Sequence, residues 1–176
     1  MMANGSVTTT FGFWLLTYGR IWMERKTMSK GRIYWEFARP FTLPAPAMGM
    51  IAGGLIAWGA APRFVSTWTG TPWRVFVNMA MGAIMAAVMN AGSNGLNQIY
   101  DLDIDRINKP SRPLPSGRLT SAEAWRFTIL AFTIGLVLAW MVNRECLMMA
   151  GVAGLLTAGY SVPPVRTKRW GIPAGL

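Results

Sequence analysis

The chain has 176 residues, of which 52% are hydrophobic and 12% aromatic, and its formal net charge is +10 at pH 7. This composition is too apolar for an ordinary soluble domain, and it favours a membrane protein over a nucleic-acid-binding protein. The single cysteine excludes an internal disulfide, and the absence of histidine removes the residue on which the usual zinc, haem and Ser-His-Asp sites depend.

Apolar runs predict an all-α membrane protein with about four transmembrane helices, preceded by an N-terminal interfacial helix. The pattern of Thr120 and Glu123 predicts a capping box at the start of the third span. The third and fourth spans are separated by only about four residues, which predicts a tight helical hairpin. The expected interfacial helix covers residues 11–23, and the expected spans cover residues 41–60, 75–100, 124–142 and 147–162.

Lysine and arginine are distributed unevenly about these spans. Segments before the first span, after the second and after the fourth contain 14 of the 17 basic residues. Loops rich in lysine and arginine stay on the cytoplasmic side of a membrane. The sequence therefore predicts a multi-pass integral membrane protein, with its N-terminus and the loop after the second span in the cytoplasm.

The second span ends in an unusual acidic segment, NQIYDLDIDRINKPSRPLPSG, at residues 97–117. Asn97, Asp101 and Asp105 are spaced i, i+4, i+8, which places them on one stripe of a helix, whereas Asp103 lies on another face. Carboxylates are disfavoured at a helix C-terminus unless a cation offsets them. Two carboxylates and an amide oxygen suit Mg²⁺, which completes its shell with water and substrate phosphate.

The loop after this stripe is cationic and stiffened by proline. Lys109 and Arg112 lie within it, and arginine binds phosphate in a bidentate manner. A second basic loop, VPPVRTKRW at residues 162–170, is expected on the same face of the membrane. Together these features predict a site for an amphiphile with a diphosphate head. The alternative is that the aspartates only end the helix in water, each paired with a nearby lysine or arginine.

The acidic segment resembles the first aspartate motif of the UbiA superfamily of intramembrane prenyltransferases. RPFTLPAP at residues 39–46 is similar to the entrance of that family's first span, and YSVPPVRTKR at residues 160–169 is similar to its loop after the fourth helix. The resemblance divides the chain into an N-terminal cytoplasmic or interfacial segment, residues 1–38, and the N-terminal half of a UbiA-like domain, residues 39–176.

The resemblance implies a helical bundle with a central cavity that opens to the cytoplasm and to lipid. It also implies Mg²⁺-dependent transfer of an isoprenyl chain from a prenyl diphosphate to a hydrophobic acceptor within the membrane. The resemblance assigns Mg²⁺ and the diphosphate to Asn97, Asp101 and Asp105, phosphate contacts to Lys109, Arg112, Arg166 and Lys168, and a place near the reacting carbon to Tyr160.

Two departures from the family pattern matter. Gln98 stands where an aspartate is usual, and no acidic residue follows Glu145, so the second aspartate motif of the family is absent from this chain. The chain is expected to be the N-terminal part of a complete enzyme. The alternative is a truncated, non-catalytic membrane subunit of a larger complex, binding lipid, quinone or pigment.

The motifs divide between branches of the family. NQIYD resembles homogentisate prenyltransferases, whereas INKPSRPLPSG and YSVPPVRTK resemble chlorophyll and bacteriochlorophyll synthases or archaeal geranylgeranylglyceryl phosphate enzymes. The expectation favours the chlorophyll-synthase-like branch, with a chlorophyllide or a quinone precursor as the acceptor.

Overall fold

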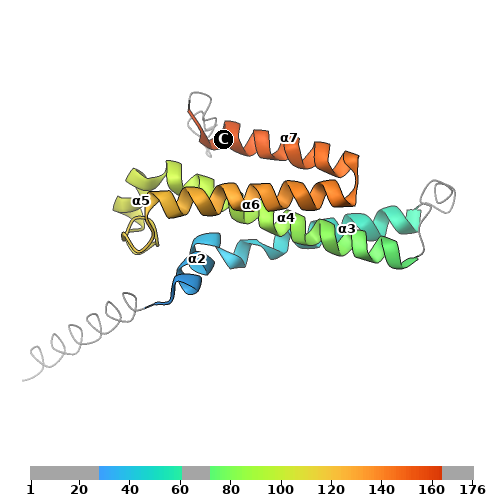
Figure 1. The fold of residues 1–176 in the computed structure, drawn as a ribbon, viewed down its shortest axis with the longest axis horizontal. Helices are drawn as coiled ribbons and strands as arrows, with labels where there is room; N and C mark the ends of the chain where they lie inside the picture. The colour runs from blue at the N-terminus through green and yellow to red at the C-terminus, as the bar shows by residue number, and fades with distance from the viewer. Residues whose placement is uncertain (1–27, 61–71, 164–176) are drawn as a thin grey trace, which may run out of the picture.

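The computed structural model describes residues 28–60 and 72–163, and every regular element in these ranges is a helix (Figure 1). The predicted all-α class is confirmed. The expected interfacial helix at residues 11–23 lies outside the described residues, as do residues 164–176. The described elements are α2 (Lys30–Ala38), η1 (Pro40–Thr42), α3 (Pro44–Ala60), α4 (Pro72–Tyr100), α5 (Leu102–Asn108), α6 (Ser121–Val142) and α7 (Arg144–Ser161).

The 29-residue helix α4 is the centre of the bundle, with α3 packed along its first half and α6 along its second (Figure 1). Glycines on α4 allow these close approaches. A Cβ on Gly82 would lie 3.0 Å from the Met50 methyl group of α3, and one on Gly92 would lie 3.2 Å from the Phe132 ring of α6. A larger residue at either position would require the Met50 methyl group or the Phe132 ring to shift.

Helices α6 and α7 form the predicted tight hairpin, joined by Asn143 alone. The predicted capping box is present at the start of α6, where the side chains and backbones of Thr120 and Glu123 bond reciprocally. Asn143 caps α7, because its Oδ1 accepts a 2.6 Å hydrogen bond from the Cys146 N–H. These caps satisfy backbone groups that have no partner within the helices.

Helices occupy all four places at which the sequence predicts spans. Trp73–Tyr100 and Ser121–Val142 are each long and apolar enough to cross a membrane. Lys30–Thr42 and Pro44–Gly59 satisfy the same conditions only together, with a 50° bend between them, so they make a third, broken span or a re-entrant segment. Helix α7 stands at the expected fourth span and its 18 residues are long enough, but its mean hydropathy is too low to satisfy the same conditions.

The proline-rich loop between α5 and α6 folds against α2. Leu114 and Leu119 are buried in one apolar cluster with Phe37 of α2. Beside this cluster, the Arg118 guanidinium donates two hydrogen bonds, 2.8 and 2.9 Å long, to the Glu36 carboxylate. The paired bonds and the apolar contacts fix the loop beside the end of α4. The cations of this loop are thereby held next to the acidic stripe.

Candidate functional site

The acidic stripe forms at the junction of α4 and α5. Although the two helices are separated at Asp101, the helical register continues, because the Asp101 N–H bonds to the Asn97 carbonyl at 2.9 Å and the Asp105 N–H bonds to the Asp101 carbonyl at 2.7 Å. Asp105 is buried, whereas the Asp103 side chain is 94% exposed and pairs with Arg106. The structure thus separates Asp103 from the stripe, as its spacing predicts.

A polar cavity of about 190 Å³ lies beside this stripe. Its lining draws together residues of α4, α5, α7, the proline-rich loop and the junction between α2 and η1. Six of the eight lining residues are predicted site residues, and the predicted phosphate contacts Arg166 and Lys168 lie outside the described residues. The lining residues are Arg39, Asn97, Gln98, Asp101, Asp105, Lys109, Arg112 and Tyr160.

The buried carboxylate of this cavity, that of Asp105, is paired with an arginine. Arg112 Nη1 lies 2.5 Å from Asp105 Oδ2, and the two side chains are 20% and 7% exposed. This pair explains how a carboxylate is tolerated in a buried position near a helix end. The ion pair engages Oδ2 of Asp105, and a carboxylate has a second oxygen that can also act as a ligand.

Asn97 is tied to α7, a contact that the sequence did not reveal. The fully buried Ser161 hydroxyl donates a hydrogen bond to Asn97 Oδ1. An amide oxygen has two lone pairs, so Asn97 Oδ1 can still accept or ligate once more. Ser161 follows the predicted site residue Tyr160 directly, and that adjacency is the only sequence signal for its role.

Arg39 is the cation of the cavity to which the sequence assigned no site role. It lies between α2 and η1 with φ 58° and ψ 65°, in the left-handed region that a residue with a side chain rarely adopts. This conformation costs on the order of 1–3 kcal/mol and persists only where neighbouring contacts hold it. The turn at Arg39 aims the chain from α2 into η1 and sets the guanidinium in the cavity.

The contacts that hold this turn come from a row of amides on α4. They donate hydrogen bonds to backbone carbonyl groups of α2 and η1, which the break between the helices leaves without helical partners. Since the amides lie on one side of α4, they fix the broken segment along that helix. The bonds run from Asn90 to the Thr42 carbonyl at 3.0 Å, from Asn94 to the Ala38 carbonyl at 3.1 Å, and from Gln98 to the Phe37 carbonyl at 2.8 Å.

Comparisons with known proteins agree with this architecture. A sequence model of the UbiA prenyltransferase family matches residues 48–174. The chain belongs to this family. It is 35% identical over 130 residues to the digeranylgeranylglyceryl phosphate synthase of Methanopyrus kandleri, with 74% of this chain and 43% of that protein covered. It is 31% identical over 150 residues to the homogentisate phytyltransferase of a Synechocystis strain, with 85% and 47% covered.

A solved structure concerned with digeranylgeranylglyceryl phosphate synthase in membranes is also similar. Its TM-score is 0.64 at 30% sequence identity, and the match covers 81% of this chain and 46% of that chain. The chain thus spans about half the length of the UbiA relatives that it matches.

Gln98 has a structural role in this UbiA chain that explains its departure from the usual aspartate. Its Nε2 group donates to the carbonyl oxygens of Phe37 at 2.8 Å and of Asn94 at 3.1 Å, and the residue is only 2% exposed. A carboxylate cannot donate either bond. The position therefore holds α2 against α4 instead of supplying a further acidic metal ligand.

The remaining oxygen ligands of the stripe suit a metal ion that also binds the substrate. Within residues 28–60 and 72–163, no three His, Cys, Asp or Glu side chains come together as a metal-binding group. The stripe offers two carboxylates, from Asp101 and Asp105, and the amide oxygen of Asn97. Mg²⁺ is commonly bound by one or two carboxylates together with water and substrate phosphates, so this donor set fits Mg²⁺.

Proposed function

We propose that the protein transfers an isoprenyl chain from a prenyl diphosphate to a hydrophobic acceptor within the membrane, in a Mg²⁺-dependent reaction. The observation that carries this proposal is the polar cavity, where the two carboxylates of the stripe lie with Arg39, Lys109 and Arg112 at one end of the membrane helices. Membership of the UbiA family and the names of the matched relatives support the same reaction class.

The cavity residues would bind and orient the diphosphate. Asp101, Asp105 and Asn97 would hold Mg²⁺, which supplies charge neutralisation to the departing diphosphate. Arg39, Lys109 and Arg112 would contact its oxygens, with the guanidinium groups as bidentate donors. Donors already directed toward the leaving group favour its departure more than they favour the intact substrate. In the second basic loop, Arg166 and Lys168 are proposed to complete this set of cations.

Tyr160 is proposed to lie near the reacting carbon. It lines the polar cavity and is about half exposed. When the bond between the allylic carbon and oxygen breaks, its electron pair leaves with the diphosphate and positive charge develops on the prenyl chain. An aromatic face attracts a cation, and an apolar surrounding excludes water that would capture it. The acceptor then forms the new bond and releases its proton.

We propose three candidates for the hydrophobic acceptor. Two of the matched relatives are named for a glycerophosphate lipid and for homogentisate, so a lipid precursor and a quinone precursor are the first candidates. A chlorophyllide is the third candidate, from the motifs in the acidic segment and in the second basic loop.

The test is a transfer assay on the protein that carries this chain. It uses an isotope-labelled allylic diphosphate, the three candidate acceptors, and either Mg²⁺ or a chelator. Asp101→Asn is expected to lower turnover by about 10²-fold or more, since one carboxylate ligand of the Mg²⁺ that stabilises the departing diphosphate is lost. Asp103→Asn is the matched control, because Asp103 is exposed and off the stripe. Equal turnover of the two variants would reject the site, and the absence of turnover with every acceptor would favour a non-catalytic subunit.

A further inference from the structure

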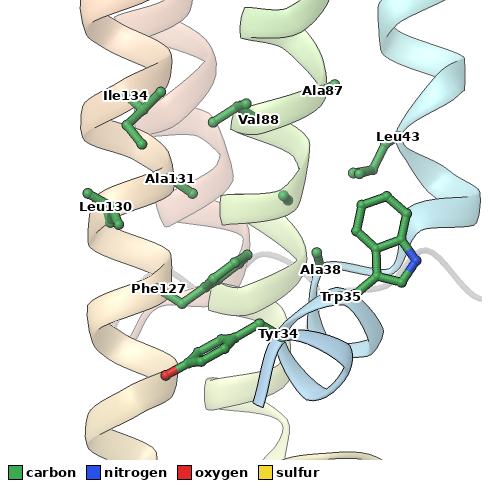
Figure 2. A pocket seen from close by; sticks show the side chains of 12 residues that line it. Tyr34, Trp35, Ala38, Leu43, Ala87, Val88, Phe127, Leu130, Ala131 and Ile134 are labelled. Carbon is green, nitrogen blue, oxygen red and sulfur yellow. The ribbon is translucent and has the colours of Figure 1, made fainter. Parts of the chain in front are cut away.

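A second cavity of about 370 Å³ lies between α2, α4 and α6, and it shares no lining residue with the polar cavity (Figure 2). Its lining is almost wholly apolar, so a ligand there gains hydrocarbon contact and no hydrogen bonds. Two of its walls are α4 and α6, which are the two helices long and apolar enough to cross a membrane, and α2 forms the third. The cavity is thus a groove on the side of a membrane bundle, separate from the proposed reaction site.

Small residues create this groove. Ala87 and Ala91 of α4 and Ala131 of α6 line it, where larger side chains would fill the space between the helices. Figure 2 shows the groove running along α6 from Phe127, beside Tyr34 of α2, to Ile134. That stretch of α6 is about 10 Å long. A groove of this length and narrowness suits one extended hydrocarbon chain.

The α2 end of the groove has the character of a membrane interface. Tyr34 and Trp35 line it, and these residue types gather at the level of lipid headgroups. Arg32 and Arg126 each adjoin a lining residue in sequence, are exposed, and form no ion pair within the described part of the chain. A third cation, Lys30, bridges α2 to Glu123 of α6 at 2.7 Å.

We propose that this groove binds one acyl chain of an anionic membrane phospholipid, whose headgroup lies beside Arg32 and Arg126. Three features select this occupant. The apolar lining favours a hydrocarbon chain, and the groove faces the side of the membrane-crossing helices. The unpaired cations at its interfacial end attract anionic lipid. The bound chain would fill the space between α2, α4 and α6 and so hold α2, which ends at Arg39, against the bundle.

Gly31 offers a way to fill the groove without disturbing its walls. It lines the groove, and a Cβ built on it has no atom within 4 Å. Gly31→Phe therefore places a ring in the space proposed for the lipid chain. Gly53 of α3 has equally open surroundings and lines neither cavity, so Gly53→Phe is the matched control.

The probe is a diazirine-tagged phosphatidylglycerol in phosphatidylcholine vesicles, with tagged phosphatidylcholine as the comparison. Peptides of the groove are expected to be labelled by phosphatidylglycerol in the wild type and in Gly53→Phe, and to lose the label in Gly31→Phe. Arg126→Gln is expected to reduce the preference for phosphatidylglycerol, whereas Arg144→Gln, at the start of α7 just beyond the opposite end of α6, leaves it unchanged. Equal labelling of Gly31→Phe and wild type would overturn the proposal.

A photo-reactive residue at Ile134 identifies the occupant directly. The proposal requires an adduct with the mass of the lipid. An adduct with a peptide from residues 1–27, or with a second protein, would overturn it. Because labelling is measured without turnover, these results do not depend on the proposed transfer reaction.

Discussion

Gln98→Glu tests whether Gln98 stabilises the fold or occupies a metal-ligand position at which a carboxylate would bind Mg²⁺ more tightly. The substitution keeps the size of the side chain and replaces its NH₂ group by a carboxylate oxygen. In the structure this NH₂ group lies 2.8 Å from the Phe37 carbonyl oxygen and 3.1 Å from that of Asn94. The introduced oxygen would face both carbonyl oxygens in a site where the residue is 2% exposed.

The expected loss follows from these contacts. Two neutral hydrogen bonds are worth about 1 kcal/mol each, and a buried group left without its partner costs about 1–3 kcal/mol. The free energy of unfolding should therefore fall by about 3–5 kcal/mol, and the turn at Arg39 should loosen because Gln98 is one of the three amides that hold it. Mg²⁺ binding should not tighten, since the new carboxylate is directed at α2.

The measurement is unfolding in mixed detergent micelles, with Mg²⁺ binding followed by calorimetry on the same samples. Asn108→Asp is the control for a new carboxylate, because Asn108 is exposed at the end of α5, and its effect should stay within about 0.5 kcal/mol. Unchanged stability together with tighter Mg²⁺ binding would refute the reasoning, because Gln98 would then behave as a metal ligand position.

Two further substitutions test the cavity itself. Arg112→Gln is expected to raise the KM for the prenyl diphosphate by about tenfold or more, since a charge-assisted bond is worth about 1.5–3 kcal/mol; Arg106→Gln, an exposed cation paired with Asp103, should leave KM unchanged in the same assay. Ser161→Ala is expected to lower the affinity for Mg²⁺ several-fold, measured by calorimetry, because Asn97 loses the bond that orients it; Ser116→Ala is the control, and equal affinities would contradict the role of Ser161.

The sequence predicted those parts of the site that depend on local periodicity. Asn97, Asp101 and Asp105 share a stripe because their spacing survives the change from α4 to α5. Asp103 lies away from them for the same reason. The hairpin and the capping box were also predictable, since each depends on residues only a few positions apart.

Contacts between distant segments could not be predicted in this way. Arg39 enters the cavity only because a left-handed turn redirects the chain, and that turn depends on amides more than 50 residues away along the chain, such as Asn94. The sequence alone indicates a missing carboxylate at Gln98, whereas the structural role of this residue depends on the Phe37 carbonyl, 61 residues away along the chain. The groove beside α2 likewise arises from alanines on two separate helices, which have no local signal.

The charges of the polar cavity account for the acidic stripe at a helix end. Arg39, Lys109 and Arg112 outnumber the carboxylates of Asp101 and Asp105, so the lining carries a net positive charge. The cations offset the repulsion between the aspartates and the helix dipole, which makes the stripe tolerable before any ligand arrives. The aspartates alone would repel a diphosphate, and the cations alone would bind it without positioning a metal. Both sets are needed for a site that recognises the anion and its Mg²⁺ together, and for this reason loss of Asp101 and loss of Arg112 are expected to have different kinetic signatures.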